Sequence, residues 1–262
     1  LRLGGSTLRL GGQPIVWSAV SSRAADSVRR VIGSDATVSV IPNGIDAARW
    51  VVPAGEKRPD TVVVASVMRV ARRKRPLPMM RMLKELRERV PSRFRIEAVI
   101  VGDGPQLPVV TDYLRRHGMQ DWVRLMGRLE HPEIREVFAN SDFYVAPARL
   151  ESFGIAALEA RCAGLPVVAS KRGGVGEFIS HGREGLLTSD DAEMVDAMAT
   201  LVTEPGLRHE MAAHNRAVAP QVTWEEVLGR ADLLYTAAQF EQAAIPTYGQ
   251  SVLDRLSSRV RW

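Results

Sequence analysis

The chain has 262 residues, enough for one large or two modest domains, and its 45% apolar and 25% charged residues are ordinary for a globular protein. Its 35 lysines and arginines outnumber 30 acidic residues, a mild excess that is typical of a solvated basic surface. The alternative is an anionic partner such as a nucleotide phosphate or an acidic lipid, and the pattern does not favour nucleic acid. There is no run of about 20 apolar residues, so the sequence predicts no membrane span.

The first 60 residues contain one strand–helix–strand unit. Strands are expected at 15–20 and 37–41, with a helix between them at 22–32 that Ser21 or Ser22 can cap. The second strand ends in the turn Pro42-Asn43-Gly44. We expect a poorly ordered segment at 1–12, where a short leucine–arginine–glycine pattern occurs twice, and a linker at 46–60.

From residue 61 the alternation of short apolar strands and amphipathic helices becomes regular. Strands are expected at 61–66, 95–101, 122–126, 143–146 and 166–169, and helices at 76–90, 106–117, 132–139 and 153–163, then at 191–203, 206–218 and 224–241. This order predicts an α/β fold, a Rossmann-like parallel sheet with helices on both faces. Ligands of such sheets bind at the carboxyl ends of the strands.

Cysteine and histidine give no sign of a metal or redox centre. Cys162 is the only cysteine and lies in a predicted helix, so a disulfide within the chain and a thiolate cluster are excluded, and core packing is favoured over a catalytic thiol. The histidines are expected on the surface or at helix ends: His117, His131, His181, His209 and His214.

The two ends of the chain leave alternatives open. No cleavable signal is visible, which favours a cytoplasmic location, and the leucine at position 1 leaves open that the chain is a fragment. Residues 246–262 are weakly amphipathic and basic, so they either form a last helix, fray, or make a peripheral contact with the inner face of a membrane.

The loop after the strand at 61–66 carries five basic residues and no acid. A diphosphate needs two converging cations, a guanidinium that bridges its oxygens and an ammonium that acts as a point charge. Arg69 and Lys74 are the candidates; the alternative is a solvated basic turn.

The next two strands end in glycine loops. Gly102 and Gly104 follow the strand at 95–101 and would let the backbone approach a ligand, although Leu107 breaks the dinucleotide-binding pattern and a tight turn is the alternative. Gly127 and Arg128 follow the strand at 122–126 and could flank a nucleobase, mainly through backbone contacts.

The most specific motif follows the strand at 143–146. Glu151 precedes a Ser-Phe-Gly turn, and Glu159 lies eight residues later inside a helix. The helix rise of about 1.5 Å per residue allows the two carboxylates to lie roughly 10 Å apart. The helix N-terminus between them offers free N–H groups for a phosphate. This pattern suits a ligand with hydroxyls at both ends and a diphosphate in the middle, as in a nucleotide sugar.

Together these motifs resemble the C-terminal domain of a family 4 retaining glycosyltransferase of the GT-B fold. The resemblance covers roughly residues 15–240. It depends on Pro42-Asn43-Gly44-Ile45-Asp46, Arg69 with Lys74, Val101-Gly102-Asp103-Gly104-Pro105, Gly127-Arg128, Glu151-Ser152-Phe153-Gly154 with Glu159, and Gly173-Gly174. It implies a truncated N-terminal acceptor domain at 1–45, the linker at 46–60, a donor-binding domain at 61–222 and a helical tail at 223–262.

The resemblance also implies a role for each residue. Arg69 and Lys74 would hold the donor diphosphate, and Glu151 would contact the hydroxyls of the donor sugar; these three form the expected catalytic set. Glu159 would bind the ribose hydroxyls. The remaining donor-binding residues are expected to be Ser152, Phe153, Gly154 and Ile155 beside the sugar and phosphate, and Gly102, Gly104 and Arg128 beside the base.

The implied reaction transfers a sugar from a UDP-, GDP- or ADP-sugar to an acceptor sugar or lipid, with retention at the anomeric carbon and with neither a cofactor nor a required metal. The sequence contains no Asp-x-Asp pair. Two alternatives stay open: a non-catalytic nucleotide-sugar-binding module or inactive fragment, and another GT-B enzyme such as an epimerase or phosphorylase, which the Glu-Ser-Phe-Gly motif disfavours. The identity of base, sugar and acceptor is not predicted.

Overall fold

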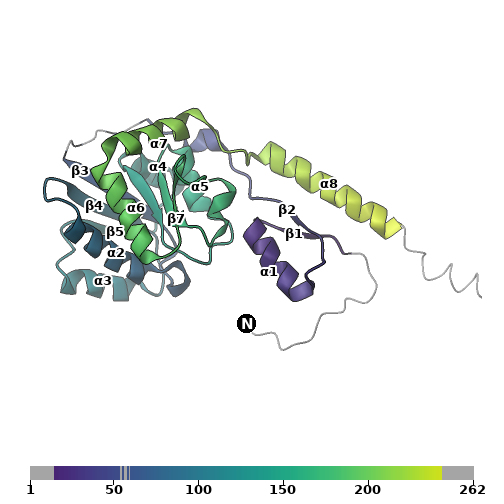
Figure 1. Cartoon of the computed structure of the whole chain (residues 1–262), viewed down its shortest axis with the longest axis horizontal. Helices are drawn as coiled ribbons and strands as arrows, with labels where there is room; N and C mark the ends of the chain where they lie inside the picture. Colours follow the sequence, from purple (N-terminus) through teal and green to yellow (C-terminus); the bar gives the residue numbers. More distant parts are fainter. Residues whose placement is uncertain (1–14, 54, 56–57, 59, 244–262) are drawn as a thin grey trace, which may run out of the picture.

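The computed structural model describes residues 15–53, 55, 58 and 60–243. It contains a large α/β domain, a small β1-α1-β2 unit and a helix, α8, that runs away from the large domain (Figure 1). The predicted disordered segment 1–12 and the tail 246–262, including its predicted membrane contact, lie outside the described residues.

A six-stranded parallel sheet forms the centre of the large domain, which confirms the predicted fold class. Its strands are β3 (Thr61–Val67), β4 (Arg95–Val101), β5 (Val123–Gly127), β6 (Phe143–Ala146), β7 (Val167–Ser170) and β8 (Gly185–Thr188). They follow the spatial order β5-β4-β3-β6-β7-β8. The chain therefore builds one side of the sheet outward from β3, then crosses back to place β6 beside β3.

Helices cover both faces of this sheet. They are α2 (Pro76–Arg89), α3 (Leu107–Arg116), α4 (His131–Ala139), α5 (Ile155–Cys162), α6 (Asp191–Thr203) and α7 (Pro205–Ala217). Successive side chains of a strand point to opposite faces. Val62 and Val64 accordingly pack in the core with α2, α3 and α6, whereas Val63 and Ala65 pack in the core with α4 and α5.

Three features differ from the sequence-based expectation. The strand β8 was not predicted. The helix expected to begin at residue 153 begins at Ile155, because Gly154 has a left-handed φ of 99° that a helix cannot include. Part of the expected linker is packed: it forms the short helix η1 (Ala47–Trp50), whose Trp50 is buried against His131 and Phe138 of α4.

The small unit consists of β1 (Trp17–Ala19), α1 (Ser22–Ile32) and β2 (Val38–Val40), with the two strands parallel. α8 (Trp224–Ala243) begins beside Gly44, where Ile45 and Thr223 form an isolated bridge. Among the described residues, none of the helices is sufficiently long and apolar to cross a bilayer.

The glycine loop after β4 packs against the loop after β3. Met68 N–H donates to Val101 O (2.9 Å) and Val70 N–H donates to Asp103 O (2.9 Å), so pairing continues past the strand ends. A Cβ on Gly102 would lie 1.8 Å from Met68 O, and Gly102 has a φ of +129°. This glycine is therefore required for the approach of one loop to another.

The change Gly102→Ala is expected to lower the free energy of unfolding by about 2–4 kcal/mol, because backbone strain and steric overlap add. Gly118 is the matched control: its φ is +59°, but nothing lies within 4 Å of its Cβ position. Gly118→Ala should cost only about 1 kcal/mol. Urea unfolding of both variants measures the difference, and equal losses would show that the contact with Met68 is unimportant.

Candidate functional site

A cavity of about 500 Å³ lies at the carboxyl ends of the strands. The loops after β3, β4, β5 and β6 contribute to it, together with α5 and Asn43 from the small unit's last turn. β3 and β6 are neighbours in the sheet but are separated in sequence by the crossover. The cavity thus opens where the strand order reverses, the position at which open α/β sheets bind ligands.

Ten of the eleven residues predicted for the site line this cavity: Arg69, Lys74, Gly102, Arg128, Glu151, Ser152, Phe153, Gly154, Ile155 and Glu159. Gly104 is not among the lining residues. A Cβ there would lie 2.5 Å from Val70 O, so Gly104 serves the contact between two loops, and its contact with a ligand stays a prediction. The structure brings the other ten together, while their individual roles stay predictions.

Lys74 and Glu151 form an ion pair within the cavity through Nζ and Oε2. Their side chains are 26% and 18% exposed, so both charges are largely removed from water. Lys74 belongs to the 3-10 helix η2 (Arg72–Lys74) before α2, and Glu151 to the loop before α5. The pair therefore joins the loops on either side of the strand-order reversal.

Arg69 is the free cation of this site. Its side chain is exposed at the cavity, and within the described part of the chain it has no ion-pair partner. Arg128 also lines the cavity. Its side chain is 84% exposed, and it forms a loose ion pair in which Nε lies 3.9 Å from Glu130 Oε1. Arg69 therefore brings to the cavity a positive charge that no described carboxylate pairs with.

Glu159 projects from α5 into the cavity and is half-buried. No described residue forms a hydrogen bond or ion pair with its carboxylate. Burial alone raises its pKa to about 7, because removal from water disfavours the charged form. A desolvated carboxylate without a partner in a cavity is suited to accept hydrogen bonds from a ligand.

The N-terminus of α5 faces the cavity between the two glutamates. Phe153 anchors the preceding turn by packing against Phe178, with ring centroids 5.3 Å apart. Gly174 N–H donates to Glu151 O (2.8 Å), and a Cβ on Gly174 would lie 2.2 Å from Ser152 O. The Gly173-Gly174 pair therefore packs against the backbone of the turn before α5. The first N–H groups of α5 stay available to an anion.

Tyr144 is a site residue that the sequence did not reveal. Its hydroxyl donates to Val67 O (2.9 Å) and accepts from Val67 N–H (3.3 Å). Burial raises the pKa of the phenol, so it remains protonated. It lines the cavity and ties β6 to the end of β3. An aromatic residue in an apolar strand is indistinguishable from core by sequence alone.

The small unit contacts the edge of the site. Ser21 Oγ donates to Ser152 O (2.6 Å) while it accepts from Ala24 N–H (3.1 Å). Ser22 N–H donates to Glu177 Oε1 (2.6 Å), so Glu177 supplies an acceptor to the first turn of α1. Ser21 thus holds this unit against the loop that carries Glu151, and Ser22 holds it against the segment that carries Glu177.

A second charged cluster lies outside the cavity. Glu184 contacts His214 Nε2 (3.1 Å) and Arg161 Nη2 (3.7 Å), and both Glu184 and Arg161 are buried. The His214 side chain is largely buried as well, and it lies in the last turn of α7, one of the two positions expected for the histidines. Cys162 is buried as expected, and burial raises its pKa to about 12.

Comparison with known proteins places this cavity in a family context. A family model described as "Glycosyl transferases group 1" matches residues 51–218. Glycogen synthase of Mycobacterium tuberculosis is 30% identical over 223 residues, which is 84% of this chain and 53% of that protein. D-inositol 3-phosphate glycosyltransferase of Actinosynnema mirum is 31% identical, over 77% of this chain and 52% of that protein.

Solved structures show the same fold. The Anabaena protein HepE, in a complex with UDP and glucose, superimposes with a TM-score of 0.71 at 22% identity, over 84% of this chain and 63% of that one. Sucrose-phosphate synthase from Thermosynechococcus elongatus gives 0.70 at 21% identity, over 84% and 57%. These neighbours are GT-B glycosyltransferases, and at such identities the likeness concerns the fold.

Proposed function

The chain belongs to the glycosyl transferases group 1 family, and we propose that its cavity binds the donor, a nucleoside-diphosphate sugar, of a retaining glycosyltransferase. The chain spans about half the length of the curated relatives that it matches, so its reaction, donor and acceptor are all part of the proposal. One observation carries the proposal: a paired Lys74–Glu151 and an unpaired Glu159 lie at a single cavity with Arg69 and the start of α5.

In the proposed arrangement, each part of the donor lies beside cavity residues that match its charge or its hydroxyls. The ribose lies at Glu159, whose carboxylate can accept from two hydroxyls. The diphosphate lies at Arg69, Lys74 and the first N–H groups of α5, because two cations and the positive end of a helix suit its negative charge. The transferred sugar then lies at Glu151, and the base lies beside Gly102 and Arg128.

The proposed chemistry breaks the bond between the anomeric carbon and the diphosphate oxygen, which keeps the electron pair. Arg69, Lys74 and the α5 N-terminus stabilise the charge that develops on this leaving group. The acceptor hydroxyl attacks from the same face and transfers its proton to a donor phosphate oxygen, so the configuration is retained. The charge of the diphosphate is balanced by side chains and backbone, and neither a metal nor a cofactor is part of the proposal.

The acceptor is proposed to be a sugar or a lipid headgroup. A family relative from Homo sapiens, 27% identical over 89% of this chain and 47% of its own length, is a phosphatidylinositol N-acetylglucosaminyltransferase subunit. The inositol phosphate glycosyltransferase of A. mirum likewise acts on a phosphorylated polyol. These names support an acceptor rich in hydroxyls and, for this chain, leave the choice between free sugar and lipid to experiment.

Calorimetry tests the donor site directly. The protein is titrated with UDP, GDP and ADP and with UDP-glucose, GDP-mannose and ADP-glucose. At least one nucleotide series is expected to bind with a Kd at or below about 1 mM. A free sugar without a nucleotide, such as glucose, serves as the control and should not bind measurably. Absence of binding by all six nucleotides would refute the donor-site proposal.

A further inference from the structure

Arg75 has a backbone conformation that needs an explanation. Among the described residues it is the one non-glycine with a positive φ (φ 58°, ψ 44°), at the junction of η2 and α2. A residue with a Cβ adopts this left-handed region at a cost, and such a conformation persists where surrounding contacts enforce it. The contacts of the Arg75 side chain therefore identify what enforces it.

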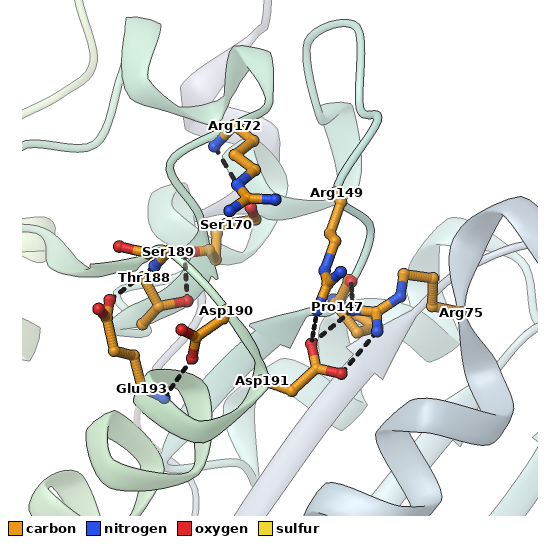
Figure 2. Close-up of polar contacts among 11 residues, drawn as sticks. Arg75, Pro147, Arg149, Ser170, Arg172, Thr188, Ser189, Asp190, Asp191 and Glu193 are labelled. Atoms are coloured by element: carbon orange, nitrogen blue, oxygen red, sulfur yellow. Dashed lines mark hydrogen bonds and ion pairs between the residues drawn. The ribbon is translucent and has the colours of Figure 1, made fainter.

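The Arg75 guanidinium is held by Asp191, the first residue of α6. Two parallel hydrogen bonds join them, Nη1 to Oδ1 at 2.8 Å and Nη2 to Oδ2 at 2.6 Å, and Nη1 also donates to Pro147 O at 3.1 Å (Figure 2). The Arg75 side chain is only 18% exposed. A bidentate pair of this kind fixes orientation as well as distance.

Asp191 holds a second guanidinium at the same time. Arg149 Nη2 donates to Asp191 Oδ1 at 2.9 Å, and Figure 2 shows Arg149 and Arg75 approaching this carboxylate from two separate segments. The two arginines hold the pKa of Asp191 below its usual range, with the Arg75 hydrogen bond as the main cause. One carboxylate thus joins the start of α6, the start of α2 and the loop after β6.

These attachments lie next to the two charged groups of the donor cavity. Lys74 immediately precedes Arg75, and Glu151 follows Arg149 by two residues. Asp191, Arg75 and Arg149 themselves are not among the residues that line the cavity. An effect on a ligand must therefore pass through neighbouring residues that do line the cavity, and Lys74 and Glu151 are the charged ones among them.

We infer that Asp191 is a positioning residue of the donor site: through Arg75 and Arg149 it fixes the separation of Lys74 and Glu151 at the diphosphate and sugar end of the donor. The inference rests on the proposed function. It assigns no role to Asp191 at the base and ribose end, where Glu159 and Gly102 belong to other segments. The two ends of the donor should consequently respond differently to its loss.

The test compares a whole donor with its nucleoside monophosphate. Asp191→Asn is expected to weaken the binding of the best sugar nucleotide of the panel about tenfold and to change the binding of the corresponding monophosphate less than twofold. Asp191→Glu keeps the carboxylate and should recover part of the loss. Asp196→Asn is the matched control, because Asp196 lies on the same helix and pairs with Arg89 on an exposed surface; it should bind both ligands as the unmodified protein does.

A ligand-free measurement separates this inference from the donor assignment. In Asp191→Asn, the backbone amides of residues 148–153 should exchange with deuterium at least tenfold faster than in the unmodified protein and in Asp196→Asn. Unchanged exchange there, unchanged sugar-nucleotide affinity, or an equal loss of affinity for the monophosphate would each overturn the positioning role. If the unmodified protein binds no nucleotide but exchange is faster in Asp191→Asn, the proposed function is refuted. The result would still show that Asp191 holds the loop.

Discussion

Lys74→Ala is expected to weaken the binding of a sugar nucleotide about 100-fold, more than Arg69→Ala, which should cost about tenfold. Each change removes a cation that is proposed to contact the diphosphate, and a charged hydrogen bond of this kind is worth about 1.5–3 kcal/mol. Only Lys74 is also paired with Glu151. Its removal leaves a largely buried carboxylate unpaired beside the diphosphate, and this repulsion adds to the loss.

A double variant isolates the repulsive part. With a nucleoside diphosphate that carries no sugar, Lys74→Ala/Glu151→Gln should bind about as well as Arg69→Ala, because the unpaired carboxylate is gone. Lys84→Ala is the control: Lys84 pairs with Glu88 on an exposed face of α2 and should have no effect. Calorimetry gives each Kd, and a Lys74→Ala protein that binds like Arg69→Ala would show that Glu151 exerts no repulsion.

The regular part of the fold was predictable because its signals are local. The apolar strand at 143–146 and the helix at 76–90 agree with β6 and α2 to within one residue. β8 was missed since its four residues, which pair with β7, form no apolar run that stands out from the loop around them. Its strand conformation is due to a neighbour in space, which periodicity along the sequence does not report.

The candidate site was also predictable where its signals are local, and not where they depend on neighbours in space. Strand-end loops with unusual chemistry, such as the basic residues around Lys74 and the Glu151-to-Glu159 motif, could be recognised one at a time and do line one cavity. Tyr144 could not, because a buried phenol has common structural uses, and Asn43 was recognised as part of a turn motif but not as a residue of the cavity. Asp191 was also invisible, since its partners Arg75 and Arg149 are more than 40 positions away in sequence. The close approach of Gly104 to Val70 could not be predicted either, because a glycine in a loop sequence does not show which neighbour comes close to it.

Glu159 should make donor binding depend on pH. Its pKa of about 7 in the ligand-free protein is raised by burial, and ribose hydroxyls that donate to the carboxylate would lower that pKa in the complex. Binding therefore releases a proton below about pH 7, so affinity rises with pH. A pKa near 7 that falls by about two units on binding predicts roughly a tenfold gain in affinity between pH 6 and pH 8.

The variant Glu159→Gln distinguishes this origin from any other titrating group. It imitates the protonated carboxyl and should bind a sugar nucleotide with the same affinity at both pH values, about tenfold weaker than the unmodified protein at pH 6 and about 100-fold weaker than the unmodified protein at pH 8. A sugar nucleotide is the required ligand, because a terminal phosphate has its own pKa near 6 and would add a second pH dependence. If the affinity of Glu159→Gln still changes with pH, another group causes the pH dependence. If the affinity of the unmodified protein does not change with pH, the ribose does not contact this carboxylate.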